Sequence, residues 1–282
     1  MNTAVDRYGV VGYPVKHSRS PFIHAMFAKQ CGQAMSYQLF EVAPENLSNE
    51  LQRFFDGGGK GWNVTVPHKQ TVFELVKYHT PRAEFAGAVN TILITADGEL
   101  MGDNTDGVGL LNDLRHHLKV ELTDKRILIL GAGGAARGVL APLLEQRPHE
   151  LIIANRNVER ATTLANEFQN LGALSGTGFN DVEPVAFDLI INATSASLQG
   201  EMPDVPDAVV GEHTLCYDMA YGKNDTVFIQ WAKQRRAAAA VQGWGMLVEQ
   251  AAESFYLWRG VRPDTVPVLV ALQNPAPPRP VV

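Results

Sequence analysis

The sequence predicts an α/β protein made of two α/β domains, the second of them Rossmann-like. Short apolar segments alternate with segments of helical periodicity along most of the chain, which is typical of parallel βαβ units. A glycine-rich turn that begins at Gly131 joins an apolar strand to a helix. The length of 282 residues suits about two domains.

Composition narrows the class of protein further. Apolar residues make up 45% of the chain and charged residues 19%, so we expect a sizeable buried core. The net charge of −6 and the scattered basic residues argue against a nucleic-acid-binding surface. We expect neither a membrane span nor a secretory leader, because no apolar run is long enough. Cys31 and Cys216 suggest no disulfide framework or metal site, which fits a reducing cytoplasm.

The strand-like segments fall into two runs. In the first half they read YGVVGY, SYQLFEV, GWNVTV and NTILIT. Helices are expected between them over Phe22–Gln30, Glu45–Phe55 and Gln70–Lys77. The second run begins with KRILIL, an apolar segment that suits a buried parallel strand, and continues with ELIIAN, FDLIIN and TLCYDM. AAAAV is a candidate fifth strand.

Two amphipathic segments predict further helices. In GDNTDGVGLLNDLRHHL one helical face collects Leu110, Leu111, Leu114 and Leu118, and this helix is predicted to bridge the domains. Near the end of the chain, GMLVEQAAESFYLW also has one apolar side. Its pattern leaves open whether it closes the second domain or returns to the first.

The glycine-rich turn predicts a dinucleotide site. RILILGAGGAARG contains G-x-G-x-x-A between a strand and a helix. Gly131 permits the tight turn, Gly133 lets the backbone approach a pyrophosphate, and Ala136 still allows close helix–strand packing. The free N–H groups of the helix would then face the phosphates. Pro142, about two turns into this helix, is predicted to kink or end it.

The end of the next strand favours NADP over NAD. An NAD site usually has a carboxylate there for the ribose 2′-hydroxyl. This chain has Asn155 and Arg156, followed by Arg160. Two guanidinium groups suit a 2′-phosphate. The alternative is a solvated arginine pair at the start of a helix.

Polar residues in the first half form candidate sites. Ser20 followed by Pro21 fits a helix N-cap and first helical position, and with Ser18 it also suits a carboxylate. Asn63 and Thr65 share one face of a predicted strand, which is either a solvent face or a pocket wall.

Three further positions are less specific. Asn90 stands beside a predicted strand, where asparagine is depleted, so it marks a turn or a site. GDNTDG contains four possible helix caps, and spacing alone does not single out Asp106. His68 is expected to be a surface or locally bonded residue rather than a catalyst.

Lys69 is an unusual residue at the start of a predicted helix. The positive end of a helix dipole disfavours a cation by about 0.3–1 kcal/mol. A nicotinamide enzyme that reduces a ketone needs a proton donor at the carbonyl oxygen, and a lysine ammonium can fill this role. Asp106 is a candidate partner that would orient the ammonium.

Eight motifs occur in order over nearly the whole chain: HSRSP, NVTVPHK, AGAVNT, GDNTDG, GAGGAARG, ANRNVER, INATS and GMLVEQ. Together they resemble the shikimate dehydrogenase family. The resemblance implies reversible, NADPH-dependent reduction of 3-dehydroshikimate to shikimate. It also implies a substrate domain over residues 1–105 and 244–282, an NADP-binding domain over 106–243, and C-terminal helices that return to the first domain.

The resemblance implies roles for individual residues. Lys69 and Asp106 match the catalytic pair. The substrate-binding positions are Ser18, Ser20, Thr65, Asn90, Asp106, Tyr221 and Gln250. The cofactor-binding positions are Gly131, Ala132, Gly133, Gly134, Ala135, Asn155, Arg156, Arg160, Thr194, Met219 and Gly243. No metal, nucleic acid or membrane partner is implied, and we expect a cytoplasmic monomer or homodimer.

This chain departs from the family pattern in loops beside the predicted nicotinamide position. Ala196 and Ser197 stand where a glycine is frequent, and Ala220 stands where bulky residues are common. Two alternatives stay open: an NAD-preferring quinate/shikimate dehydrogenase, and an NADPH-binding sensor without activity. Arg156 argues against the first, and the pair of Lys69 and Asp106 argues against the second.

Overall fold

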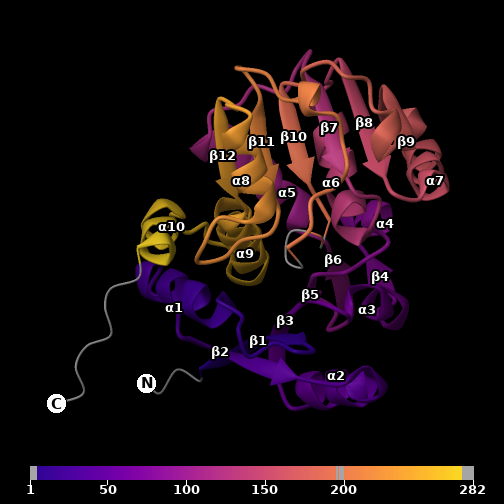
Figure 1. The fold of residues 1–282 in the computed structure, drawn as a ribbon. Helices are drawn as coiled ribbons and strands as arrows, with labels where there is room; N and C mark the ends of the chain where they lie inside the picture. The colour runs from indigo at the N-terminus through magenta and orange to yellow at the C-terminus, as the bar shows by residue number, and fades with distance from the viewer. Residues whose placement is uncertain (1–4, 195, 197–199, 275–282) are drawn as a thin grey trace. The chain divides into compact units, whose positions relative to one another are not determined.

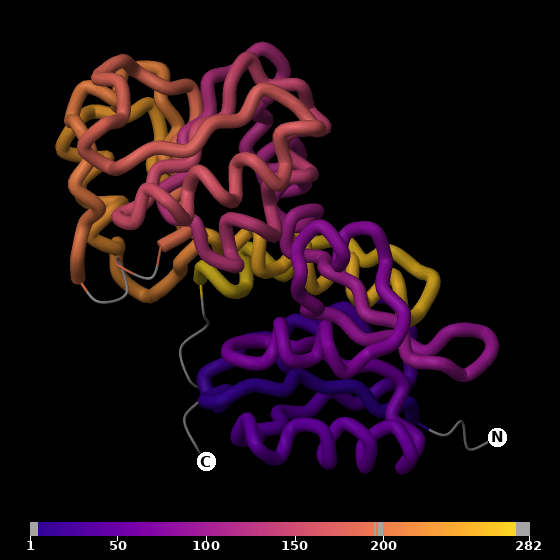
Figure 2. The backbone as a smooth tube through the Cα atoms, turned by 90° about the vertical axis from the view of Figure 1, so that its right-hand side faces the viewer, coloured from indigo at the N-terminus to yellow at the C-terminus, as the bar shows by residue number. Residues whose placement is uncertain are grey.

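The computed structural model of the protein describes residues 5–194, 196 and 200–274. The chain divides into two compact units, Met1–Gly109 with Leu247–Val282 and Leu110–Met246. The division falls inside helices α5 (Asp106–Asn112) and α9 (Trp244–Arg259), a few residues beyond each predicted domain boundary. Figures 1 and 2 trace the backbone of both units.

The first unit contains a mixed six-stranded sheet in the order β2-β1-β3-β5-β6-β4. The strands are β1 (Asp6–Gly12), β2 (Met35–Glu41), β3 (Gly59–Val64), β4 (Tyr78–His79), β5 (Thr91–Ile94) and β6 (Leu100–Asp103). β1 pairs in parallel with β2 and β3, whereas β5 runs antiparallel to β3 and β6. The predicted parallel pairing is therefore confirmed for β1 with β2 and β3 but does not extend to β5.

Helices cover the first sheet. They are η1 (Pro44–Asn46, a 3₁₀ turn), α1 (Ser20–Gln30), α2 (Leu47–Asp56), α3 (Lys69–Leu75), α4 (Pro81–Ala86) and α10 (Val266–Gln273). α2 lies along one face of the sheet (Figures 1 and 2). Its Phe54 stacks on Trp62 of β3. Ser20 is the first residue of α1 and Arg19 is its N-cap, so the predicted cap is wrong by one residue.

The C-terminal helices belong to the first unit. α10 lies beside α1 (Figure 1), and Gln30 of α1 donates from Nε2 to the carbonyl of Asp264 at 3.2 Å. Trp258 of α9 donates from Nε1 to the carbonyl of Ile92 in β5 at 2.9 Å. These bonds attach the described residues after Leu247, up to Asn274, to helix α1 and to strand β5 of the same unit.

A buried histidine lies in the aromatic cluster between α1, β2 and α9. His24 is fully buried, and its ring stacks on Tyr37 with centroids 4.2 Å apart and planes 8° from parallel. Burial lowers the pKa of His24 to about 3, and the side chain of Asn63 opposes this shift only in part. The imidazole is therefore neutral at neutral pH.

The wild-type protein should lose stability faster on acidification than a His24→Phe variant. In the unfolded chain His24 titrates near 6.5, so between this pH and about 3 only the unfolded state binds the proton. The free energy of unfolding then falls as pH falls through this window, by up to about 1.4 kcal/mol per pH unit from this group. Urea denaturation of both proteins at several pH values measures the difference, and parallel pH dependences would contradict it.

The second unit contains a parallel six-stranded sheet in the order β12-β11-β10-β7-β8-β9. The strands are β7 (Arg126–Leu130), β8 (Glu150–Asn155), β9 (Leu174–Gly178), β10 (Leu189–Asn192), β11 (Leu215–Asp218) and β12 (Ala239–Gln242). Chain order reverses direction between β7 and β10, which is the switch point of a Rossmann-like sheet. The predicted strand at AAAAV is confirmed as β12, while β9 was not predicted.

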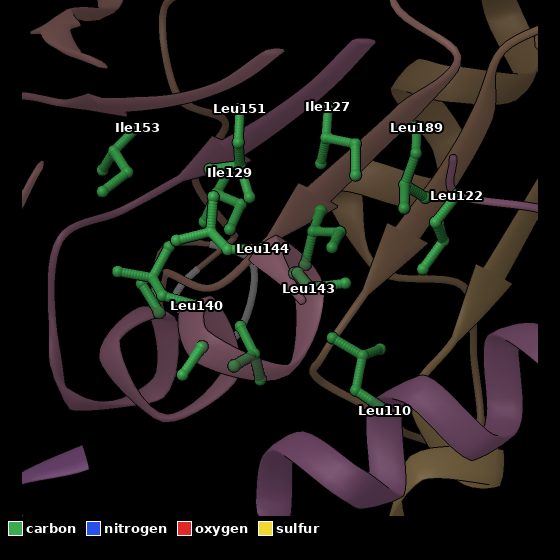
Figure 3. Packing of buried hydrophobic residues seen from close by; sticks show 14 of the residues in the cluster. Leu110, Leu122, Ile127, Ile129, Leu140, Leu143, Leu144, Leu151, Ile153 and Leu189 are labelled. Atoms are coloured by element: carbon green, nitrogen blue, oxygen red, sulfur yellow. The ribbon is translucent and has the colours of Figure 1, made fainter. Parts of the chain in front are cut away.

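Both faces of this sheet are covered. The helices are α6 (Gly134–Leu144), α7 (Val158–Phe168) and α8 (Val227–Gln234), with a π-helix η2 (Asp113–His117) and 3₁₀ turns η3 (Gln169–Leu171), η4 (Phe179–Asp181) and η6 (Asp207–Val209). Ile127 and Ile129 of β7 pack with α6, whereas the alternate residues Leu128 and Leu130 pack with α8. Figure 3 shows the apolar cluster that contains Ile127, Ile129 and residues of α6. α6 continues for two residues beyond Pro142 before it ends.

The predicted bridging helix consists of α5 and the π-helix that follows it. Leu110 and Leu114 are fully buried in the core of the second unit, and Leu111 and Leu118 pack against this core. The predicted apolar face is therefore confirmed. Among the described residues, no helix is both long and apolar enough to cross a membrane.

Candidate active site

The structure brings Lys69 and Asp106 together in the first unit. Lys69 is the first residue of α3, directly after the turn that follows β3, and Asp106 is the first residue of α5. The Nζ atom of Lys69 lies 2.5 Å from Oδ2 of Asp106. The side chains are 29% and 19% exposed, so both can reach a small molecule. The carboxylate thereby orients the ammonium group.

Asn90 binds the other oxygen of the same carboxylate. It lies directly before β5 and is buried. Its Nδ2 donates to Oδ1 of Asp106 at 2.8 Å, and its Oδ1 accepts from the backbone N–H of Thr105 at 2.8 Å. Asp106 is therefore held from both sides, by Lys69 and by Asn90.

The predicted serine pair lies in the same unit, next to a series of hydrogen-bonded polar side chains. Ser18 and Ser20 have hydroxyl oxygens 3.2 Å apart. Burial raises the pKa of the Tyr37 phenol, and a hydrogen bond with Ser20 partly opposes this. The Tyr37 hydroxyl donates to Oδ1 of Asn63 at 2.7 Å, and Nδ2 of Asn63 donates to the carbonyl of Asn90 at 3.2 Å. Polar contacts therefore run from the serines to Asn90.

The structure corrects one prediction around β3 and excludes one of two alternatives for His68. β3 ends at Val64, so Thr65 lies in the following turn and does not share a strand face with Asn63. The backbone N–H of Thr65 donates to the carbonyl of Val11 at 2.9 Å. His68, expected to be a surface or locally bonded residue, is 1% exposed, so the surface alternative is wrong. Its Nε2 lies 2.8 Å from the carbonyl oxygen of Val42.

Gln250 of α9 joins this site through two hydroxyl groups. The hydroxyls of Thr105 and Ser254 both donate to the Gln250 carbonyl, at 3.1 and 3.0 Å. Ser254 is fully buried and also accepts from Nδ2 of Asn63 at 3.0 Å. Ser254 and Tyr37 were not predicted from the sequence. The four-residue spacing from Gln250 to Ser254, on one side of a helix, was the available signal.

Gly109 sets how closely α5 approaches α9. A Cβ atom at this position would lie 2.7 Å from both the backbone nitrogen and Cβ of Gln250. No side chain fits there without moving the backbone of α9, because the obstructing atoms belong to a helix backbone rather than to a flexible side chain.

A Gly109→Ala variant should therefore bind and convert the substrate of this site less well. A displacement of Gln250 of this kind lowers kcat/KM by about 10- to 100-fold. Binding of a ligand to the glycine turn of the second unit should stay unchanged and serves as the internal control for folding. An unaltered kcat/KM would show that the position of Gln250 is unimportant.

The second unit holds a pocket of about 800 Å³ along the predicted dinucleotide site. Its lining includes Gly131, Ala132, Gly133, Gly134, Ala135, Asn155, Arg156, Arg160 and Thr194. Gly131 has φ +107°, which favours glycine, and Gly133 is the N-cap of α6. Added Cβ atoms at Gly133 and Gly134 would meet open space, so the backbone at the start of α6 is accessible to a ligand.

The two arginines of this pocket have guanidinium N–H groups that are available to bind a ligand. Arg156 and Arg160 are exposed, and neither guanidinium has an acidic partner within the part of the chain that the structure describes. Asn157 caps α7 by accepting from the backbone N–H of Arg160 at 3.1 Å. A dinucleotide with a 2′-phosphate fits this lining, because two arginine cations and a glycine turn meet in one pocket.

The remaining predicted residues lie on loops of the second unit. A Cβ atom at Gly243 would be 2.5 Å from the carbonyl oxygen of Met219, so these two residues pack backbone to backbone. The backbone N–H of Gly243 donates to the carbonyl of Ala220 at 3.1 Å. The ring of Tyr221 lies 4.7 Å from that of Trp244.

The loop after β10 carries the other sequence departures. Ala196 lines the pocket, and Ser197 lies outside the described residues. Thr194 is held by Asn192, whose Oδ1 accepts from the Thr194 hydroxyl at 2.7 Å and from its backbone N–H at 3.2 Å. In residues 5–194, 196 and 200–274, His, Cys, Asp and Glu form no group of three or more that could hold a metal ion.

Three family models match the chain in sequence order. Residues 10–92 match the shikimate dehydrogenase substrate binding domain. Residues 113–205 match shikimate / quinate 5-dehydrogenase, and residues 243–273 match the shikimate 5′-dehydrogenase C-terminal domain. Together these segments include most of the two units.

Individual proteins match over almost their whole length. A curated relative, shikimate dehydrogenase (NADP(+)) of Methylococcus capsulatus, is 51% identical over 271 residues, which is 96% of this chain and 97% of the relative. The crystal structure of an Ael1 enzyme from Pseudomonas putida matches with a TM-score of 0.90 and 43% identity over 96% of this chain and 99% of that one. Shikimate 5-dehydrogenase from Thermus thermophilus, in complex with NADP(H) and shikimate, matches with a TM-score of 0.84 and 32% identity over 95% and 98%.

Proposed function

We propose a reaction for this chain from one established premise: it belongs to the shikimate dehydrogenase family. The chain is an NADP-dependent oxidoreductase that interconverts shikimate and 3-dehydroshikimate, a step of the shikimate pathway towards chorismate and the aromatic amino acids. The observation that carries the proposal beyond kinship is the Lys69–Asp106 pair, whose charged atoms lie 2.5 Å apart with Asn90 on the opposite carboxylate oxygen.

Lys69 moves the proton in this reaction. During reduction the ketone oxygen gains negative charge, and the Lys69 ammonium stabilises this charge and then protonates the oxygen. During oxidation the neutral amine of Lys69 accepts the proton from the hydroxyl group. Asp106, fixed by Asn90, keeps the lysine side chain directed. When bound, NADP(H) supplies or accepts the hydride.

Polar side chains hold the substrate. Ser18 and Ser20, at the start of α1, receive the carboxylate, which accepts hydrogen bonds from their hydroxyl groups. The ring hydroxyls of the substrate are held by the polar groups of Thr65, Asn90, Asp106, Tyr221 and Gln250. The hydrogen bond between Asn90 and Asp106 supports the assignment of these two residues, because the Asp106 carboxylate then serves both substrate binding and proton transfer.

The pocket of the second unit holds the cofactor. The residues from Gly131 to Ala135 receive the pyrophosphate at the start of α6, where backbone N–H groups are accessible. Asn155, Arg156 and Arg160 hold the 2′-phosphate. Thr194, Met219 and Gly243 stand near the nicotinamide. The pocket lining and the exposed arginines support these roles except for Met219 and Gly243, which are not among the lining residues and whose role rests on the family resemblance.

Product identification tests the proposed reaction in the reducing direction. The protein is mixed with NADPH and 3-dehydroshikimate, NADPH consumption is followed by absorbance, and the product is separated by chromatography. We expect shikimate in an amount equal to the NADPH consumed. Tight NADPH binding with no turnover of any hydroxycyclohexene acid would instead favour the sensor alternative.

Two further proposals concern the setting of the enzyme. The free thiols of Cys31 and Cys216 support a reducing, cytoplasmic location. We also propose that the enzyme works as a monomer or homodimer. Light scattering of the purified protein measures its mass and decides between these states.

A further inference from the structure

Arg82 of α4 joins two elements that carry the proposed substrate site. Its Nε and Nη2 donate to the two carboxylate oxygens of Asp103, at 3.0 and 2.5 Å. Its Nη1 donates to Oε1 of Glu253 at 2.9 Å. Asp103 ends β6, just before the loop with Asp106, and Glu253 lies on α9. All three nitrogens of the guanidinium group therefore donate hydrogen bonds, two to Asp103 of β6 and one to Glu253 of α9.

Asp103 acts on Asp106 through one intervening side chain. It is fully buried, and its Oδ1 also accepts from the backbone N–H of Asn104 at 2.7 Å. The side-chain oxygen of Asn104 accepts in turn from the backbone N–H of Asp106 at 3.1 Å. The first turn of α5, which presents the Asp106 carboxylate to Lys69, is thus tied to the Arg82–Asp103 pair.

Glu253 acts on the other side of the site. It follows Gln250 by three residues, so the two lie on the same side of α9. The Thr105 hydroxyl, from the loop before Asp106, donates to the Gln250 carbonyl at 3.1 Å. The contact of Arg82 with Glu253 and that of Thr105 with Gln250 both hold α9 against this loop.

Burial and charge make Arg82 difficult to replace. Asp103 is 0% and Glu253 7% exposed, so each carboxylate depends on partners inside the protein. Burial works against the charged form of Arg82, but hydrogen bonds and charges from Asp103 and Glu253 outweigh it and raise the pKa of Arg82. A lysine has a single charged nitrogen and cannot bind both oxygens of Asp103 and Glu253 in one plane.

We propose that Arg82 is a positioning residue for the reaction, one that sets the place of Asp106 relative to Gln250 by clamping Asp103 and Glu253. The inference rests on the proposed function, because it assigns Asp106 and Gln250 to the substrate. Arg82 itself touches neither the substrate nor Lys69. It acts through the loop at one end and the helix at the other.

Steady-state kinetics of an Arg82→Lys variant test this role. We expect kcat/KM for shikimate to fall by about 10- to 100-fold, from both a lower kcat and a higher KM. NADP affinity should stay within about twofold of wild type, because the glycine turn belongs to the other unit. The matched control is Arg262→Lys. Arg262 donates to Oε2 of Glu253 at 2.7 Å but does not contact Asp103. The kcat/KM of the Arg262→Lys variant should therefore differ from that of wild type by less than about threefold.

Each outcome bears on the proposal. Activity of Arg82→Lys close to wild type would overturn it, and so would losses shared equally by Arg262→Lys. If kcat/KM falls only in proportion to the fraction of the variant that still binds NADP, the cause is general instability rather than positioning. This result would also overturn the proposal. If Arg82→Lys does not fold, Glu253→Gln decides, with a smaller loss expected in kcat/KM and unchanged NADP binding. An inactive wild-type protein would instead reject the proposed function itself.

Discussion

Replacing Lys69 by alanine should lower kcat for shikimate oxidation by about 100-fold or more, while the affinity for shikimate stays within about tenfold. The variant lacks the only side chain that the proposed mechanism uses to move the proton. Most of the groups that hold the substrate, including Ser18 and Asn90, remain in place. Steady-state kinetics and a separate binding titration give the two numbers.

Two further variants make this test specific. Lys69→Arg keeps a positive charge beside Asp106, but a guanidinium group does not release its proton, so this variant should also be slow. Lys60→Ala removes an exposed lysine from β3 and should leave kcat unchanged. A Lys69→Ala variant with nearly normal kcat would remove Lys69 from the mechanism. A fully active Lys69→Arg variant would leave it only an electrostatic role.

Replacing Arg156 by alanine should weaken NADP binding by about 10- to 100-fold, because a hydrogen bond to a charged group contributes about 1.5–3 kcal/mol. NAD has no 2′-phosphate, so its affinity should be almost unaffected. The preference for NADP over NAD therefore decreases, mainly because the affinity for NADP is lower. Fluorescence titration of both cofactors against wild type and variant measures it.

The matched control is Arg115→Ala, which removes an exposed arginine of the same unit that does not line the pocket. It should change neither affinity. Equal losses of NADP and NAD affinity in Arg156→Ala would contradict the 2′-phosphate clamp. Such a result would indicate that Arg156 supports the pocket in general.

The second unit could be predicted well from the sequence because its central strands are largely buried on both faces. Parallel strands of this kind appear as continuous apolar runs, and KRILIL, ELIIAN, FDLIIN and TLCYDM all contain strands of the sheet. β9 (Leu174–Gly178) was missed because it contains two glycines and no apolar run. In the first unit β4 was missed because its two residues show no periodicity, and β6 because its sequence LMGD includes glycine and aspartate, which are depleted in strands.

The predicted family is confirmed, and the residues that its motifs identify include Lys69 and Asp106, which the structure brings together. The supporting network could not be predicted in this way. Arg82 and Glu253 are 171 residues apart in the chain, and Asn63 and Ser254 are 191 apart. Contacts at such separations depend on the tertiary fold and leave no periodic pattern in the sequence.

The most direct test of the proposed reaction is a comparison of four catalytic efficiencies in one assay. Wild-type protein is supplied with shikimate or quinate, each with NADP or NAD, and formation of the reduced cofactor is followed by absorbance. We expect the highest kcat/KM for shikimate with NADP. A higher value for quinate with NAD would assign the chain to the alternative dehydrogenase activity, and absence of turnover in all four mixtures would contradict the assignment of a catalytic function.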